Sequence, residues 1–429
     1  MANTMNWIER DAAVVWHGFT QMDCYGANAP VIVERAEGRE LIGTDGRRYL
    51  DAISSLWVTT LGHRVPELDQ ALRDQIDRVA HSTLLGNGNR VVIEFAEALA
   101  GVVPVDHPHF LFASDGACAV EQALKIAFQY WTNRGVSGRT AYLAFGDGYH
   151  GDTIGSLSLG GGGFGTAVFD PLRFPVIRAP SFADPGALRV AAEMVREHHQ
   201  RLAAVIVEPL VQGAAGMLIA RAGEFAQLAA ACRETGVLLI CDEVATGFGR
   251  TGTLFASQRC ELRPDLLCLG KGITGGYLPM SATVAAHHVY EAFLGADLST
   301  RTLYHGHSYG GNALAAAVGL RHLQLLQSTS VLENVHARST QLARALDAHV
   351  RPHRCVKDIR LIGLMGAVEL DTTADPKLAR RAGAAMVSRG VLSRSMGPVL
   401  TLVPPLTITA AEIDRIVATM AAALEEVAC

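Results

Sequence analysis

An aspartate and a lysine each follow a short apolar run, and their types suggest a cofactor-dependent reaction. Residues 237–240 are apolar and precede Asp242, and residues 266–269 are apolar and precede Lys271. Runs of this length and composition predict parallel strands that are buried on both faces. The carboxyl ends of such strands border the ligand crevice of an open α/β sheet. We therefore expect the Asp242 carboxylate and the Lys271 amine to meet in one crevice.

Glycines flank Lys271 on both sides, and no carboxylate stands beside it in the sequence. A lysine amine without an ion-pair partner suits Schiff-base chemistry with an aldehyde. Pyridoxal 5'-phosphate (PLP) is such an aldehyde, and it acts as an electron sink when a carboxylate faces its protonated ring nitrogen. The sequence predicts Asp242 for that carboxylate and places the short, apolar Val244 under the ring.

Each of these two residues also has an ordinary explanation. Asp242 alone fits a turn at a strand end, and Lys271 alone fits a solvated lysine. That explanation weakens when three motifs are taken together in their order along the chain, because one motif match alone carries false positives. The motifs are Asp242-Glu243-Val244, Gly247-Phe248-Gly249-Arg250-Thr251-Gly252 and Leu269-Gly270-Lys271-Gly272.

The phosphate and the open ring face of PLP need further residues. Residues 110–112 predict a short strand, and the apolar spacing after it predicts a helix that begins near Gly116 and Ala117. Free backbone N–H groups and the helix dipole suit a phosphate at that end. Tyr149 follows another predicted strand, residues 142–145, and is our candidate for stacking on the ring. The alternative for Tyr149 is a tyrosine of the core.

Helical and strand patterns alternate from about residue 61 to 325, which predicts a doubly wound α/β domain. Residues 31–51 predict a β-meander with turns at Glu37-Gly38 and Asp45-Gly46. The glycines at 160–163 lack the strand and helix that a dinucleotide site requires. They predict a mobile loop at the active site instead.

Composition excludes several classes of function. The 429 residues are 49% hydrophobic, which indicates a globular protein with more than one domain. The formal net charge is −5 without a basic block, so neither nucleic acid nor an anionic membrane is expected as a partner. Eight cysteines without a C-x-x-C pair predict reduced thiols in a cytoplasmic protein. His305 and His307 lack a third ligand nearby, so no metal site is expected.

The segment from Asp242 to Lys271 closely resembles the signature of the class III PLP-dependent aminotransferases. The resemblance implies the PLP-dependent transferase fold type I, in a homodimer whose active site is shared across the interface. It also implies a large PLP-binding domain, residues 61–325, and a small α+β domain built from residues 1–60 and 326–429.

A narrower resemblance extends over nearly the whole chain. Several motifs are similar to a subgroup of biotin biosynthesis that transfers an amino group to 8-amino-7-oxononanoate. Most members of that subgroup use S-adenosylmethionine as the amino donor, and a minority use lysine. The motifs are Trp16-His17-x-Phe19-Thr20-Gln21-Met22, Ser54-Ser55-x-Trp57, Ala119-Val120-Glu121, Tyr149-His150-Gly151-Asp152-Thr153, Glu208-Pro209-x-Val211-Gln212-Gly213 and Arg394.

The resemblance implies a role for each matching residue toward PLP. Lys271 forms the Schiff base, Asp242 holds the ring nitrogen, and Tyr149 stacks on the ring. The backbone N–H groups of Gly116 and Ala117 receive the phosphate, and the Ser308 hydroxyl reaches the phosphate of the other subunit.

The same resemblance implies a set of substrate contacts. Arg394 clamps the distal carboxylate, a task that suits a bidentate guanidinium. Arg250 and Asp152 lie nearer the polar ends of the substrates. The full set of expected substrate-binding residues is Phe19, Trp57, Tyr149, Asp152, Arg250 and Arg394.

Three positions depart from the subgroup. Ala117 replaces its usual serine, which removes a hydroxyl contact to the phosphate. Leu56 stands where a first tryptophan of a pair is common, and Phe19 stands where many members have tyrosine. The last two departures leave the amino donor open. The sequence of residues 305–309 is more similar to that of the lysine-using minority. S-adenosylmethionine is favoured because most members of the subgroup use it as the donor.

Three other functions remain open at this point. A class III aminotransferase that acts on an ω-amino acid or a diamine, with pyruvate or 2-oxoglutarate, shares Asp242 and Lys271 but does not need Trp57 or Phe19. An isomerase of the glutamate-semialdehyde aminomutase kind shares the fold and uses no separate donor. A non-catalytic PLP-fold binding protein is the third, and the intact Asp242, Lys271 and Tyr149 argue against it.

Overall fold

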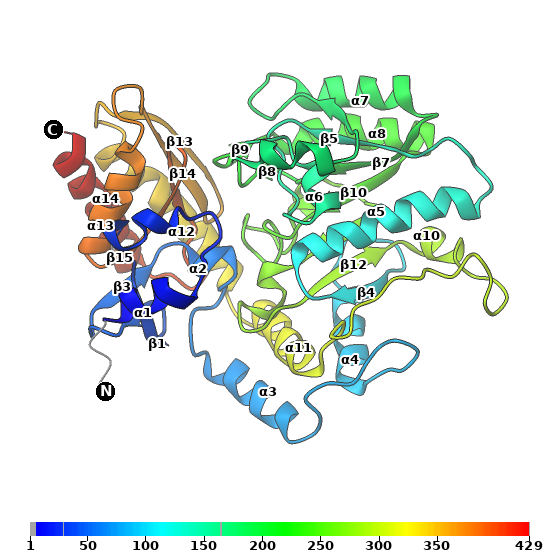
Figure 1. Ribbon diagram of the computed structural model, residues 1–429, viewed down its shortest axis with the longest axis horizontal. Helices are drawn as coiled ribbons and strands as arrows, with labels where there is room; N and C mark the ends of the chain where they lie inside the picture. Colours follow the sequence, from blue (N-terminus) through cyan, green and yellow to red (C-terminus); the bar gives the residue numbers. More distant parts are fainter. Residues whose placement is uncertain (1–5, 29, 164, 429) are drawn as a thin grey trace.

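The computed structural model describes residues 6–28, 30–163 and 165–428. Its largest sheet has seven strands in the order β4-β12-β11-β10-β7-β5-β6 (Figure 1). The strands span His109–Ala113 (β4), Ser281–Ala285 (β12), Leu266–Leu269 (β11), Leu238–Asp242 (β10), Leu202–Val207 (β7), Ala141–Phe145 (β5) and Ile177–Ala179 (β6).

The central strands of this sheet are parallel and fully buried. β11, β10, β7, β5 and β6 pair in parallel, and only β12 runs antiparallel to its two neighbours. Every residue of β10 and β11 is buried. Strands covered on both faces carry continuous apolar runs, and the prediction of two buried parallel strands before Asp242 and Lys271 is confirmed.

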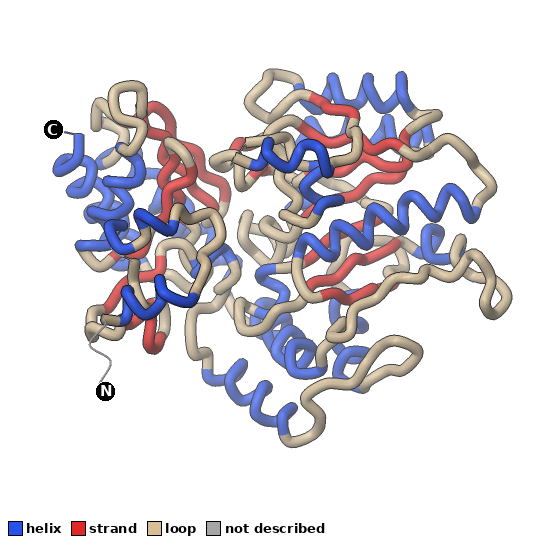
Figure 2. Tube along the Cα trace, viewed as in Figure 1, coloured by secondary structure: helices blue, strands red, loops and turns tan. Residues whose placement is uncertain are grey.

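Helices cover both faces of the large sheet (Figure 2). α5 (Gly116–Asn133) packs its apolar side on one face, together with inward residues of β5, β7, β10 and β11. On the other face, α7 (Ala187–His198) and α8 (Phe225–Thr235) share a core with the alternate residues of the same strands. α4 (Arg90–Ala100) and α11 (Ala313–Ser328) belong to that second core. The predicted doubly wound α/β architecture is confirmed.

Both ends of the chain meet in a second part of the molecule (Figure 1). β1, β2 and β3 form the predicted antiparallel meander, and β15 joins it in parallel beside β3. β13, β14, β17 and β16 form an antiparallel sheet, accompanied by three helices. The elements span Val33–Glu37 (β1), Glu40–Gly43 (β2), Arg48–Asp51 (β3), Val391–Leu392 (β15), Val356–Ile362 (β13), Met365–Leu370 (β14), Val399–Leu402 (β17), Arg394–Met396 (β16), Val331–His349 (α12), Leu378–Ser388 (α13) and Ala410–Ala428 (α14).

Short elements connect these layers. A two-stranded ribbon, β8 (Val211–Gln212) with β9 (Leu218–Ile219), follows β7, and a single 3₁₀ turn, η5 (Lys271–Thr274), follows β11. Among the described residues, no helix is long and apolar enough to cross a membrane. The other elements are α1 (Trp7–Val14), α2 (Ser54–Trp57), α3 (Pro66–Ile76), α6 (Ile154–Leu159), α9 (Ala256–Arg259), α10 (His287–Glu291), η1 (Met22–Cys24), η2 (Gly26–Asn28), η3 (Thr166–Leu172) and η4 (Ala222–Glu224).

Candidate active site

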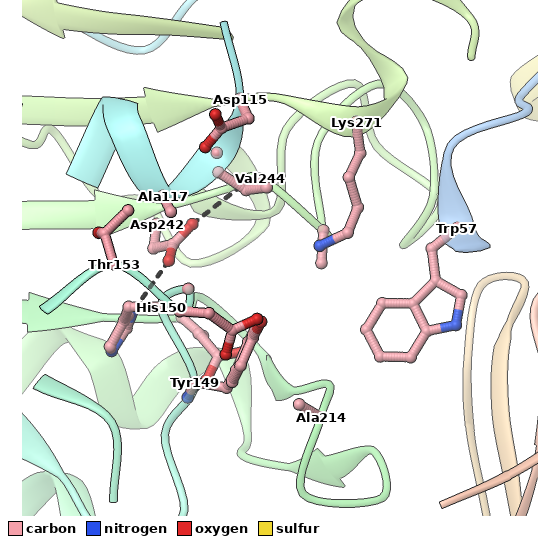
Figure 3. A pocket seen from close by; sticks show the side chains of 15 residues that line it. Trp57, Asp115, Ala117, Tyr149, His150, Thr153, Ala214, Asp242, Val244 and Lys271 are labelled. Atoms are coloured by element: carbon pink, nitrogen blue, oxygen red, sulfur yellow. Dashed lines mark hydrogen bonds and ion pairs between the residues drawn. The ribbon is translucent and has the colours of Figure 1, made fainter. Parts of the chain in front are cut away.

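A cavity of about 470 Å³ opens at the carboxyl ends of the parallel strands. The end of β10 contributes Asp242, and the turn after β11 contributes Lys271. The start of α5, the segment after β5 and the tryptophan of α2 complete its walls (Figure 3). Residues more than two hundred positions apart in the sequence therefore face one space, and the expected meeting of Asp242 and Lys271 is found.

Asp242 is buried and paired with a histidine. His150 Nδ1 lies 2.7 Å from Asp242 Oδ2, and both residues are 5% exposed. The backbone N–H of Val244 donates to Asp242 Oδ1 at 3.0 Å. These two contacts fix the orientation of the carboxylate. The sequence places His150 in a motif but assigns it no role, because its partner Asp242 lies far along the chain, at the end of β10.

Lys271 lines the cavity from the first residue of η5 and has a left-handed backbone, with φ of +42°. Its Nζ lies 5.4 Å from the ring centroid of Trp57, and no ion pair joins it to a described carboxylate. Burial lowers the pKa of Lys271, and the more distant charges of Asp242 and Glu208 oppose part of that shift. The amine is therefore a better nucleophile near neutral pH than an ordinary lysine.

Glu208 is a buried acid that the sequence analysis did not assign. It follows β7, lines the cavity, and accepts hydrogen bonds from the backbone N–H groups of Tyr149 and Gly213, each at 3.1 Å. Burial raises the pKa of Glu208 to about 7, and the charge of Asp242 adds to the effect. Its position at the end of a buried strand and its place in the Glu208-Pro209-x-Val211-Gln212-Gly213 motif are the two sequence signals that point to the site.

The start of α5 forms another wall of the cavity. Asp115 caps the helix by accepting a hydrogen bond from the Cys118 N–H at 3.0 Å. A Cβ on Gly116 would lie 2.5 Å from Cγ1 of Val244, so only glycine fits between the helix and the Val244 side chain that follows β10. The first N–H groups of a helix lack intrahelical partners. Gly116 and Ala117 thus offer such groups to the cavity beside Val244.

Tyr149 and Asp152 line the cavity together. The Tyr149 hydroxyl donates to Asp152 Oδ2 at 2.9 Å, and burial raises the pKa of the tyrosine. Glu121 of α5 accepts the Gly155 N–H at 2.7 Å, which ties this segment to the helix. The glycine run at 160–163 packs nearby, since the Gly161 N–H donates to the Gly148 carbonyl at 2.8 Å. Its mobility stays a prediction.

Trp57 is both buried and a wall of the cavity, with 7% of its surface exposed. Ser54, Ser55 and Trp57 all have positive φ, between +50° and +64°. Such conformations persist when the surroundings hold them. Asp51 supplies part of that hold, because it accepts the Ser55 N–H at 2.8 Å and the Ile53 N–H at 3.2 Å.

Four residues expected at the site do not line this cavity. Phe19 is 64% exposed, and Arg394 is an exposed residue of β16. Arg250 is only 1% exposed, and its guanidinium donates to the Pro404 carbonyl and, at 3.3 Å, to Ser54 Oγ. Ser308 is exposed, and its carbonyl accepts from His81 at 2.7 Å. Within one chain, Arg250 thus braces the segment that carries Trp57.

The chemistry of the cavity fits PLP. A buried carboxylate suits a protonated ring nitrogen, an amine with a lowered pKa suits an aldehyde, and a helix N-terminus suits a phosphate. One observation tests the fit most directly. The backbone of α5 at Gly116 lies so close to Val244 and the cavity that no side chain fits at position 116.

Comparison with known proteins agrees with this chemistry. Residues 23–424 match the family described as "Aminotransferase class-III". A relative from Nitratidesulfovibrio vulgaris, named adenosylmethionine-8-amino-7-oxononanoate aminotransferase, is 44% identical over 96% of this chain and 80% of its own length.

Two solved structures extend the likeness to three dimensions. The enzyme of that same name from Methanocaldococcus jannaschii superposes with a TM-score of 0.93 at 37% identity and covers 98% of both chains. An amine transaminase from an uncultivated Pseudomonas species, described in its PLP-bound form, superposes with a TM-score of 0.91 at 31% identity. It covers 96% of this chain and 99% of its own.

Proposed function

Because the chain belongs to the class III aminotransferase family, we propose that it transfers an amino group from S-adenosylmethionine to the ketone of 8-amino-7-oxononanoate. The product of that transfer is 7,8-diaminononanoate, a step of biotin biosynthesis. The chain is a PLP-dependent aminotransferase of fold type I. The observation that carries the substrate proposal is the name shared by relatives that are 36–44% identical over nearly the whole chain.

PLP, when bound, supplies an aldehyde that condenses with amines and a ring that accepts electrons from the neighbouring carbon. The residues of this chain hold and tune that group. The Asp242 carboxylate keeps the proton on the ring nitrogen, and His150 holds the carboxylate in place at 2.7 Å. Backbone N–H groups of Gly116 and Ala117, which line the cavity, would hold the phosphate, and Tyr149 and Val244 would pack against the ring.

Lys271 has two tasks in this proposal. With PLP bound, its Nζ would hold the aldehyde carbon of the cofactor between turnovers, because burial lowers the pKa of the amine and so favours the neutral, nucleophilic form. With substrate bound, the same Nζ would act as the general acid and base that carries the proton at the reacting carbon. Trp57 lies beside Nζ and excludes water from that transfer.

The remaining expected residues act through the assembly in this proposal. We infer a homodimer in which Ser308 reaches the phosphate site of the other subunit, which accounts for its exposed position in one chain. Phe19 and Arg394 are also exposed in one chain. In the homodimer they close the substrate-binding side of the cavity, and Arg394 binds the distal carboxylate of the substrate. The large domain then spans residues 61–325, and residues 1–60 and 326–429 form the small one, in a cytoplasmic enzyme.

The test is a pair of half-reactions with the PLP-loaded protein. S-adenosylmethionine, lysine, alanine and a diamine are added separately, and the visible absorbance of the cofactor is followed. The protein is then treated with 8-amino-7-oxononanoate, and the product is identified by mass spectrometry. We expect S-adenosylmethionine to bleach the absorbance and the oxononanoate to restore it with formation of 7,8-diaminononanoate.

Other outcomes assign the protein differently. Bleaching by lysine alone changes the donor and keeps the acceptor. Bleaching only by alanine or the diamine, without recovery on the oxononanoate, contradicts the proposal and indicates an ω-aminotransferase. The chain has only four lysines, Lys125, Lys271, Lys357 and Lys377, so borohydride reduction and peptide mapping will identify the attached lysine directly. Attachment at any residue other than Lys271 contradicts its role.

A further inference from the structure

His322 is a fully buried, titratable residue that the proposed reaction does not use. It lies on α11, and none of its surface is exposed. Its Nε2 lies 2.6 Å from the hydroxyl oxygen of Thr60, which is also buried. Burial lowers the pKa of His322 to about 3, so the imidazole is neutral at physiological pH. A neutral histidine in such a place acts through shape and hydrogen bonds.

The turn that carries Lys271 packs directly on this pair. A Cβ on Gly275 would lie 3.1 Å from Cδ2 of His322, and a Cβ on Gly272 would lie 3.1 Å from Cγ2 of Thr60. A Cβ on Gly276 would lie 2.9 Å from the backbone of Thr59. Gly275 and Gly276 also have positive φ, at +64° and +86°. The glycines after Lys271 therefore allow a contact between turn and pair that larger residues prevent.

The second ring nitrogen faces the same turn. The backbone of Ile273 lies close enough to the imidazole to oppose part of its pKa shift. Nδ1 nevertheless makes no hydrogen bond of normal geometry among the described residues. The Ile273 carbonyl oxygen points toward α11, since a Cβ on Gly319 would lie 3.1 Å from it. A buried polar atom without a hydrogen bond of normal geometry calls for an explanation. His322 Nδ1 lies between α11 and the strained turn of Lys271.

Thr60 connects the pair to the segment that carries Trp57. It lies three residues after Trp57, and its carbonyl accepts the N–H of Leu406 at 2.6 Å. The Lys271 turn and the Trp57 segment thus rest on one hydrogen-bonded pair, although they belong to different parts of the chain. Both segments also contain non-glycine residues with positive φ, which need such support.

We propose that His322 is a positioning residue that fixes the Lys271 turn to the Trp57 segment and so holds the lysine amine in the cavity. The inference rests on the proposed role of Lys271. His322 touches neither the cavity nor the reacting atoms, and it acts through the turn and through Thr60. A change at His322 alters the environment of the Lys271 amine before it alters substrate binding.

The test compares variants that keep or remove the hydrogen bond. His322→Leu and Thr60→Val remove it. His322→Gln and Thr60→Ser each keep a polar atom that can reach the partner side chain. Leu326→Ala is the control, because Leu326 is buried on the same helix one turn further along. The first readout is the pH titration of the visible absorbance in the PLP-loaded protein. The second is the rate at which Lys271 is acylated in the cofactor-free protein, measured by peptide mapping.

We expect His322→Leu and Thr60→Val to shift the midpoint of both pH profiles by at least about half a pH unit. They should lower kcat about tenfold and change KM less than about twofold, since a small displacement of a reacting group costs rate rather than affinity. His322→Gln and Thr60→Ser should restore the midpoints. The double variant His322→Leu/Thr60→Val should add little to either single change, because one interaction is lost in both.

The inference is wrong if His322→Leu only lowers the unfolding temperature, as Leu326→Ala does, and leaves both midpoints in place. Failure of the proposed function has a different signature: the visible absorbance of the PLP-loaded wild-type protein persists unchanged in Lys271→Ala. In that case the acylation profile of the cofactor-free protein still decides the positioning role, because it does not depend on PLP.

Discussion

His150 Nδ1 and Asp242 Oδ2 lie 2.7 Å apart in a site where both side chains are almost fully buried. The histidine follows β5 and the aspartate ends β10, two strands separated in the sheet by β7. Replacing the histidine by an apolar group leaves a buried carboxylate with fewer donors. This pair therefore offers the most direct way to weaken the cofactor site without touching the cofactor.

We predict that His150→Leu weakens PLP binding by about tenfold to a hundredfold, because a hydrogen bond to a charged group contributes roughly 1.5–3 kcal/mol. His150→Asn retains a donor at the Nδ1 position and should recover most of the affinity. Equilibrium dialysis of PLP measures the effect. His288→Leu is the matched control. His288 Nε2 lies 2.9 Å from Asp265 Oδ1, and neither residue lines the cavity. Equal losses in the two leucine variants would contradict the prediction.

Lys271 should react with acylating reagents at a lower pH than Lys357 in the cofactor-free protein. Burial lowers the pKa of Lys271, whereas the ion pair with Glu369 raises that of Lys357. The neutral amine is the reactive form, so the rate profile of Lys271 should rise first as the pH increases. Mass spectrometry of the peptides follows both lysines in one sample. A profile for Lys271 that coincides with that of Lys357 contradicts the lowered pKa.

Glu208 should make the cofactor-free protein less stable as the pH rises from about 4.5 to 7. Its pKa is about 7 in the folded chain against an ordinary value of 4.5. In this interval the unfolded chain has lost a proton that the folded chain still holds, so the free energy of unfolding falls with pH. The slope is at most about 1.4 kcal/mol per pH unit. Its full stabilising contribution is present below pH 4.5 and is lost as the pH passes 7.

Glu208→Gln should remove this part of the slope, because the amide does not titrate. Denaturant unfolding of wild type and variant at several pH values between 4 and 8 measures the difference. Groups that do not interact with Glu208, such as His322, titrate equally in both proteins and cancel in the comparison. Parallel stability curves would show that Glu208 keeps an ordinary pKa in the folded chain.

Gly116→Ala should weaken PLP binding by about tenfold, since the added Cβ lies 2.5 Å from Val244 Cγ1 and overpacking costs about 1–3 kcal/mol. Val244→Ala in the same chain should restore part of the affinity by making room. Gly223→Ala is the control, because a Cβ there meets nothing within 4 Å. The prediction fails if Gly116→Ala binds PLP as tightly as Gly223→Ala does.

The sequence by itself determined the elements that carry the site. The apolar runs before Asp242 and Lys271 are the strands β10 and β11, because a strand buried on both faces leaves a continuous apolar signature. The start of α5 at Gly116 was predicted from the helical spacing that follows it. These features are local, so a stretch of ten or twenty residues contains the information.

Tertiary structure decided which side chains share the cavity. His150 and Glu208 meet Asp242 only because β5, β7 and β10 are neighbours in the sheet, and no local pattern encodes strand order. Arg250, for which the resemblance implies a substrate contact, is buried within one chain against Ser54 and Pro404, which its motif does not reveal. The hold of His322 on the Lys271 turn joins residues from distant parts of the chain. Such contacts depend on how whole elements pack, and that packing is a property of the folded chain.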